Sequence, residues 1–245
     1  MLGLGLAGCG SSASTHFTVE SQLVGRSLKQ AVILPPGNSE GRPLLVLLHG
    51  RSSTPDDMAR KSIADAVDKL GADAPVVLLA NGGNHSYYHD RRDGRWGSYI
   101  LREAIPAAIR RFHLDRKRVA IGGFSMGGFG ALDLARYRRF CAVGGHSAAM
   151  WRTGGETPQG AFDDAEDFER NDVIGLARSN PGLYHGARIW LDVGTDDPFM
   201  SADTELAGLL PGRRFRLWHG GHEITYFDDH AVEILRFYAN ALRDC

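Results

Sequence analysis

The chain has 245 residues, of which 43% are hydrophobic, and its formal net charge is -1 at pH 7. That length is sufficient for one large domain with a substantial core. Basic and acidic residues are interspersed rather than gathered on one face or stripe, so no nucleic-acid partner is expected. No apolar run approaches the roughly 18 residues of a membrane-spanning helix.

The N-terminus resembles the attachment signal of bacterial lipoproteins. Leu6-Ala7-Gly8-Cys9 matches the lipobox, and a small, polar tether follows it. The residues before it are too few for an apolar leader and include no basic residue, so either the true start lies upstream or the match is accidental. The resemblance implies a lipid on Cys9 and an extracytoplasmic location, anchored to the bacterial envelope or secreted. We assign residues 1–15 to the signal remnant and tether, and residues 16–245 to one folded domain.

The folded domain is predicted to begin with strands. Residues 17–24 and 28–34 have strand patterns, and the Pro-Pro-Gly-Asn sequence at 35–38 ends the second. The uninterrupted apolar run at 44–48 is typical of a central parallel strand that is covered on both faces. Residues 54–57 then form a helix start, with a hydroxyl N-cap, a proline at the first position and acids in the first turn.

Strands and helices alternate through the rest of the chain. Further strands are expected at 76–80, 140–144, 189–193 and 214–218, and helices at about 99–112 and in the final segment, where residues 231, 234, 235, 238 and 242 are apolar at helical spacing. The polar segment 151–186 is expected to hold helical pieces. This alternation implies right-handed crossovers and a mostly parallel sheet with helices on both faces, the α/β class.

The Gly-Gly-Phe-Ser-Met-Gly-Gly sequence at 122–128 is the most informative stretch of the chain. A strand pattern precedes it and a helix pattern follows it, and its core from Gly123 to Gly127 is the G-x-S-x-G pattern of a nucleophile elbow. Glycine is needed at both ends because side chains in so tight a turn would collide with backbone. Ser125 is therefore expected above the sheet edge, beside the unpaired N–H groups of the helix start.

A serine hydroxyl is a weak nucleophile, so it needs an adjacent base, and the base needs an orienting acid. Candidate acids occur in and after the predicted strand at 189–193. Asp197 is favoured over Asp196 because it lies three residues past Gly194 and precedes a turn-forming proline. Asp192 lies within the strand and is expected to bond to backbone.

Candidate bases follow the predicted strand at 214–218, and the carboxyl ends of strands are where open α/β sheets form their sites. His222 is favoured because the Gly-Gly pair at 220–221 permits a tight, exposed loop before it. His219 lies closer to the strand and is interpreted as structural.

An oxyanion formed at Ser125 requires two backbone donors. The N–H of Met126, directly after the serine, is expected to be one. The other is expected in the loop after residues 44–48, where we choose the N–H of Arg51. His49, in the same loop, is interpreted as a loop-pinning hydrogen-bonding residue rather than a catalytic one.

The cysteines and histidines have no metal-like spacing, so no metal site is expected. Cys9, Cys141 and Cys245 are scattered, and Cys141 lies in an apolar run typical of a buried free thiol. Six further histidines are expected at the surface or in the core: His85, His89, His113, His146, His185 and His230.

With these candidates assembled, the chain resembles the esterase-D-like group of α/β-hydrolases, which includes S-formylglutathione hydrolases, feruloyl and acetyl-xylan esterases, and mycolyltransferases. The resemblance covers about residues 17–243 and rests on the segments 35–37, 49–50, 82–99, 123–128, 194–199 and 220–222. It implies an α/β-hydrolase fold and carboxylic-ester hydrolysis through an acyl-enzyme, without a cofactor or metal. Ser125, His222 and Asp197 would be the nucleophile, base and acid.

The substrate is expected to be a small-molecule or carbohydrate-linked ester with a short-chain or aryl group. Candidates for lining its pocket are Tyr87, Tyr88, Trp96 and Trp151, although ordinary loop packing explains these aromatic residues equally well.

The acid residue bears on the alternatives to hydrolysis. Mycolyltransferases of this group carry a glutamate as the acid, and the aspartate found here disfavours mycolyl transfer. The alternatives are acyl transfer to a sugar or other alcohol, and a catalytically inactive binding module, which has no need for all three side chains.

Overall fold

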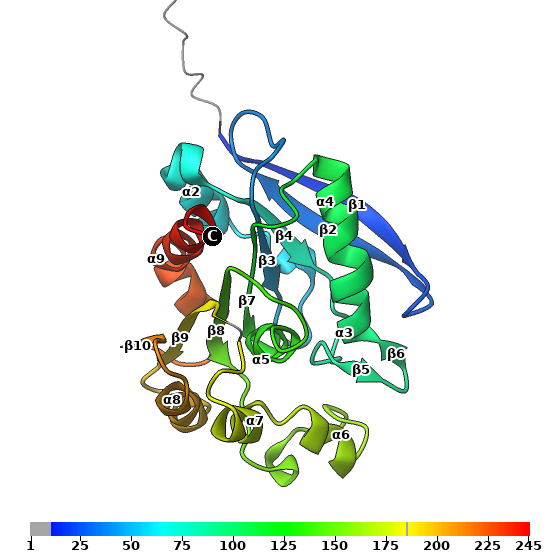
Figure 1. The fold of residues 1–245 in the computed structure, drawn as a ribbon, viewed down its shortest axis with the longest axis vertical. Helices are drawn as coiled ribbons and strands as arrows, with labels where there is room; N and C mark the ends of the chain where they lie inside the picture. The colour runs from blue at the N-terminus through cyan, green and yellow to red at the C-terminus, as the bar shows by residue number, and fades with distance from the viewer. Residues whose placement is uncertain (1–10, 185) are drawn as a thin grey trace, which may run out of the picture.

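The computed structural model describes residues 11–184 and 186–245, so the predicted lipid site at Cys9 and the histidine at 185 lie outside the described residues. The main sheet has eight strands in the order β1-β2-β4-β3-β7-β8-β9-β10 (Figure 1). These strands are β1 (Ala13–Ser21), β2 (Arg26–Leu34), β3 (Leu44–Leu48), β4 (Val76–Ala80), β7 (Val119–Ser125), β8 (Ala142–Ala148), β9 (Arg188–Gly194) and β10 (Arg214–Trp218).

The sheet is mostly parallel, as predicted. β2 pairs antiparallel with β1 and with β4, whereas all pairings from β4 to β10 are parallel. Alternate residues of β3 enter different core clusters: Leu44, Val46 and Leu48 face one layer of helices. Leu45 and Leu47 face the other. A strand with period two that is covered on both faces has to be apolar at every position, which explains the uninterrupted run.

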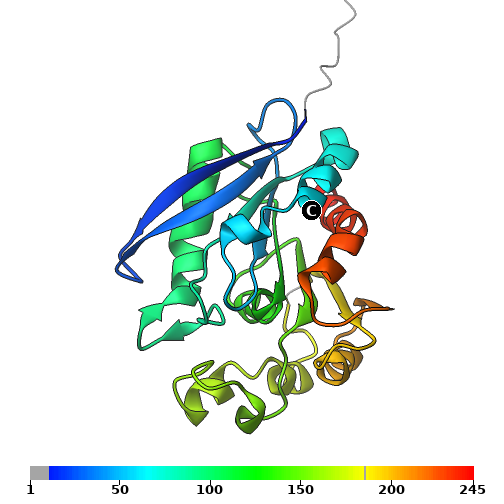
Figure 2. The ribbon, with the colours of Figure 1, turned by 180° about the vertical axis from the view of Figure 1, so that it is seen from behind.

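Helices cover both faces of the sheet (Figures 1 and 2). α2 (Lys61–Leu70) and α9 (Ile224–Arg243) pack on one face, and α4 (Ile105–Phe112) and α5 (Met126–Leu134) on the other. The remaining helices and the small hairpin are α1 (Pro55–Met58), α3 (Trp96–Tyr99), α6 (Ala165–Arg170), α7 (Val173–Ser179), α8 (Met200–Leu209), β5 (Asp90–Arg91) and β6 (Gly94–Arg95); a π-helical turn, Ile100–Ala104, joins α3 to α4. None of the described helices is both long and apolar enough to cross a membrane.

Element boundaries differ from the prediction where apolar patterns are weak. β1 begins at Ala13, so residues 13–15 lie in the sheet rather than in the tether, and none of these three residues is buried. β8 extends to Ala148, beyond the predicted end at 144. The pattern did not indicate this extension, because the second half of the strand consists of small and polar residues. By contrast, Thr54 caps α1 as predicted: its Oγ1 accepts the N–H of Asp57 at 3.2 Å, and Asp57 Oδ2 accepts the N–H of Thr54 at 2.9 Å.

Cys141 forms a disulfide with Cys245, so the prediction of a buried free thiol is wrong. Cys141 lies directly before β8, and Cys245 lies two residues after the end of α9. The two cysteines are 104 positions apart in the sequence. Cysteine spacing alone carries no information on this pairing, because the pairing depends on how closely the end of α9 approaches the start of β8.

Candidate active site

The predicted site residues gather at one edge of the sheet. Ser125 ends β7, and Arg51, Asp197 and His222 lie in the loops that follow β3, β9 and β10. Because these four strands are parallel, their carboxyl ends lie along the same edge. In Figure 1 this is the lower edge, where the β5–β6 hairpin and helices α6 to α8 also lie.

Ser125 lies in a strained turn between β7 and α5. Its φ of 56° and ψ of -119° are rarely adopted by residues other than glycine. A Cβ on Gly127 would overlap the carbonyl oxygen of Leu48, and a Cβ on Gly123 would lie 2.8 Å from the same oxygen. Both glycines are therefore required for α5 to start this close to the end of β3.

A continuous chain of hydrogen bonds joins the serine to a histidine and an aspartate. Ser125 Oγ lies 2.8 Å from His222 Nε2, and His222 Nδ1 lies 2.8 Å from Asp197 Oδ2. Because a carboxylate only accepts, Nδ1 carries the proton, which leaves the Nε2 lone pair facing the serine hydroxyl. Asp197 is itself held by the N–H of Phe199, which donates to Oδ1 at 2.7 Å.

The competing candidates lie elsewhere. Asp196 and His219 are both exposed. Asp192 is completely buried, and the prediction that it bonds to backbone is wrong. Its carboxylate binds two side chains instead, His146 Nδ1 at 2.6 Å and the Tyr226 hydroxyl at 3.1 Å.

The imidazole of His222 packs between two aromatic rings. Phe124 stacks on it with ring centroids 5.2 Å apart, and Phe199 meets it edge-on at 5.0 Å. Phe124 and Phe199 were not among the predicted site residues. Their positions in the sequence could have indicated them, because each lies within two residues of Ser125 or Asp197.

The start of α5 and the loop after β3 both lie beside Ser125. Met126 is the first residue of α5, so its N–H has no acceptor within the helix. The loop after β3 approaches from the other side, because a Cβ on Gly50 would lie 3.5 Å from Ser125 Cβ. Arg51 follows Gly50 directly, with an exposed side chain.

His49 fixes this loop, as predicted. Its Nδ1 lies 2.9 Å from the carbonyl oxygen of Gly50, and its Nε2 accepts the N–H of Gly82 at 3.2 Å. Burial lowers the pKa of His49, which favours the neutral ring that this pair of bonds requires.

Tyr87 and Trp151 belong to an aromatic cluster that extends from His222. Trp151 contacts Phe199 at 5.6 Å between ring centroids, and Tyr87 contacts Trp151 at 5.2 Å. Burial raises the pKa of Tyr87, and the neighbouring Arg51 guanidinium opposes that rise. The cluster continues into Phe129, Phe162 and Phe168.

Tyr88 and Trp96 are packed within the fold, so ordinary loop packing, the alternative to a pocket role, accounts for these two rings. Tyr88 is completely buried, its ring fills the space beside Gly130, and its hydroxyl donates to the carbonyl oxygen of His49 at 3.1 Å. Trp96 is 3% exposed and lies against Gly83. The aromatic composition of a loop does not show which way each ring points.

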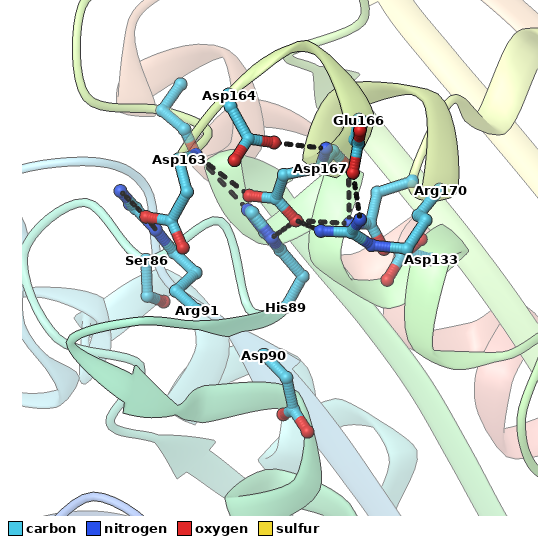
Figure 3. Close-up of polar contacts among 12 residues, drawn as sticks. Ser86, His89, Asp90, Arg91, Asp133, Asp163, Asp164, Glu166, Asp167 and Arg170 are labelled. Carbon is cyan, nitrogen blue, oxygen red and sulfur yellow. Dashed lines mark hydrogen bonds and ion pairs between the residues drawn. The ribbon is translucent and has the colours of Figure 1, made fainter.

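A polar cluster joins the loop that carries Tyr87 to the segment before α6 (Figure 3). His89 Nε2 donates to the carbonyl oxygen of Ala161 at 3.2 Å, and Arg91 pairs with Asp163 at 3.2 Å. Burial lowers the pKa of His89 to about 4, so its ring is neutral near pH 7. These contacts hold two segments that are distant in sequence against one another and so fix Tyr87.

Within residues 11–184 and 186–245, no three or more His, Cys, Asp or Glu side chains are grouped to hold a metal ion. Five of the histidines predicted at the surface or in the core lie within the described residues. His85 and His113 are exposed, His89 and His146 are buried, and His230 is half-buried and stacked on Trp218.

Comparison with known proteins places the chain in a family. The Esterase family, described as "Putative esterase", matches residues 21–233. The chain belongs to this family. The S-formylglutathione hydrolase of Paracoccus denitrificans (strain Pd 1222) is 26% identical over 264 residues, which cover 91% of this chain and 91% of that protein.

Solved structures share the fold. A ferulic acid esterase has a TM-score of 0.81 at 23% identity, over 94% of this chain and 98% of that chain. An S-formylglutathione hydrolase from Agrobacterium tumefaciens has a TM-score of 0.77 at 20% identity, over 95% and 96%. The predicted family, the α/β-hydrolase fold and the classification as an esterase are confirmed.

We predict that Gly127→Ala disrupts the elbow, because the new methyl group overlaps the carbonyl oxygen of Leu48. The free energy of unfolding should fall by about 2 kcal/mol or more. Gly208→Ala is the matched control, since a Cβ at this position in α8 meets nothing within 4 Å. Its expected effect is neutral or stabilising by up to about 1 kcal/mol. Urea denaturation measures both, and equal stabilities would contradict this account of the turn.

Proposed function

We propose that the protein is a serine esterase that hydrolyses carboxylic esters through an acyl-enzyme, with Ser125, His222 and Asp197 as its catalytic triad. One observation carries the proposal. Two hydrogen bonds of 2.8 Å link the three side chains in series, and the serine is held in a strained turn at a helix start. Membership of the Esterase family supports the reaction class.

In the proposed reaction, Ser125 Oγ attacks the ester carbonyl carbon while His222 Nε2 takes the hydroxyl proton. The resulting imidazolium donates that proton to the leaving alkoxide, and the acyl group stays on the serine. Water then attacks the acyl-enzyme while His222 Nε2 takes its proton, and the imidazolium returns that proton to Ser125 Oγ as the acid is released. Each proton has a stated donor and acceptor, so the cycle needs no cofactor.

Asp197 and two amides have supporting roles in this proposal. The Asp197 carboxylate keeps the proton of His222 on Nδ1 and stabilises the imidazolium that forms. The N–H groups of Met126 and Arg51 are assigned to the oxyanion of the tetrahedral intermediate. Each such donor typically contributes about 3 kcal/mol to transition-state stabilisation.

We assign short-chain or aryl esters as the substrate class, in small molecules or linked to carbohydrate. The support is the aromatic cluster: Trp151 and Tyr87 are joined to the base through Phe199, whose ring lies 5.0 Å from His222. Flat apolar side chains connected to the proposed base favour a flat or short apolar group in the bound ester.

The test is hydrolysis of a series of p-nitrophenyl esters by the wild type and by variants. Ser125→Ala should lower kcat by a factor on the order of 10⁴ or more, because the nucleophile is lost. His222→Ala and Asp197→Asn should also lower kcat, by at least about a hundredfold. Their matched controls are His219→Ala and Asp196→Asn, which change exposed neighbours outside the hydrogen-bonded chain.

Equal turnover by the wild type and Ser125→Ala would show that the proposed function is wrong. The acyl-transferase alternative differs only in the acceptor, so product analysis with a sugar or glycerol present separates it from hydrolysis. An inactive wild type would favour the binding module.

We propose an extracytoplasmic location, with a lipid on Cys9 as the anchor. The support within the described residues is the disulfide between Cys141 and Cys245, because such bonds persist in oxidising compartments and are rare in the cytosol.

Membrane attachment is tested by fractionating cells that express the natural gene. Cys9→Ala should move the protein from the membrane fraction to the soluble extracytoplasmic fraction, whereas Ser11→Ala, two residues away, should not. A wild-type protein found in the cytosol, or an unchanged distribution in Cys9→Ala, would contradict the anchor.

A further inference from the structure

A second chain of hydrogen bonds lies buried behind the candidate site, in side chains from β8, β9 and α9. The Tyr226 hydroxyl donates to Asp192 Oδ1 at 3.1 Å, and Asp192 Oδ2 lies 2.6 Å from His146 Nδ1. His146 Nε2 lies 2.8 Å from the Tyr238 hydroxyl. None of these four residues is more than 3% exposed.

One arrangement of protons satisfies every group in this chain. The Asp192 carboxylate only accepts, so the Tyr226 hydroxyl and His146 Nδ1–H both donate to it. His146 Nε2 then accepts from the Tyr238 hydroxyl. Burial raises the pKa of both tyrosines, so they keep their protons. A buried network with all its partners in place is rigid, whereas one unpaired member is costly.

The Tyr226 end of the network is adjacent to the His222 loop. Tyr226 lies in the first turn of α9, four residues after His222, and its N–H donates to the carbonyl oxygen of Glu223 at 3.0 Å. Its ring lies 3.2 Å from where a Cβ on Gly220 would be. The carbonyl oxygen of Gly220 in turn accepts the N–H of Asp196 at 2.9 Å. One side chain therefore supports both loops of the proposed triad.

The Tyr238 end is farther from that loop. Tyr238 lies twelve residues beyond Tyr226 in α9, about 18 Å along the helix axis. Its hydroxyl occupies the place that a Cβ on Gly122 or Gly144 would take, which explains glycine in the middle of two buried strands. The two tyrosines thus attach α9 to the same Asp–His pair, one near His222 and one remote from it.

We infer that Tyr226 is a positioning residue for the proposed esterase: its hydrogen bond to Asp192 fixes the first turn of α9 and so holds His222 at Ser125. The inference rests on the proposed function. Removing the hydroxyl leaves the ring contact with Gly220 but frees the helix start from β9. A displacement of about 1 Å in a catalytic group can cost on the order of a hundredfold in rate.

The test compares Tyr226→Phe with Tyr238→Phe, which each remove one buried hydroxyl from the same network. The two melting temperatures should fall by similar amounts. Only Tyr226→Phe should lower kcat, by at least about tenfold, while KM stays within about twofold. Tyr226→Phe should also slow the covalent labelling of Ser125 by a fluorophosphonate.

A third readout does not depend on turnover: the downfield proton resonance of His222 Nδ1–H should weaken in Tyr226→Phe and persist in Tyr238→Phe. Unchanged kcat in Tyr226→Phe, or equal losses of kcat in both variants, would overturn the positioning role. A wild type without esterase activity whose resonance responds as described would refute the proposed function and leave the positioning role intact.

Discussion

The backbone of α5 packs directly on the end of β3, with no side chain between them. Gly123 and Gly127 make this possible, because a Cβ on either would collide with the carbonyl oxygen of Leu48. The same contact forces the left-handed backbone of Ser125 and directs the start of α5 at the space above the sheet. The proposed nucleophile and a polarised helix terminus therefore share one origin, the close approach of two backbone segments.

Backbone hydrogen bonds join the loops after β9 and β10, in addition to the bond between Asp197 and His222. The N–H of Thr195 donates to the carbonyl oxygen of Trp218 at 2.8 Å, and the N–H of Asp196 donates to that of Gly220 at 2.9 Å. Gly194 has no side chain to keep the Gly220 carbonyl away. β10 is an edge strand, so these bonds and the buried Tyr226–Asp192 contact supply the order that a second neighbouring strand would give. These contacts between the two loops hold Asp197 Oδ2 within 2.8 Å of His222 Nδ1.

The sequence was most informative where one local signal decides the structure. Uninterrupted apolar runs located β3 and β4. The side chains that cap α1 at Thr54 and the glycines around Ser125 likewise determine the backbone within a few residues of themselves. Prediction failed where the outcome depends on contacts distant in sequence. The partner of Asp192 is His146, 46 residues away, and that of Cys141 is Cys245, 104 residues away. Ring direction in the loop around Tyr88 likewise depends on Gly130, which leaves the space that the ring occupies.

The central claim is that Ser125 becomes covalently acylated with His222 as its base. Peptide mass spectrometry after acid quenching of a slowly hydrolysed p-nitrophenyl ester reaction measures this most directly. The account predicts one acyl group per chain, on the peptide that contains Ser125, and none in His222→Ala under the same conditions. An acyl group on another residue, or equal acylation in His222→Ala, would contradict it.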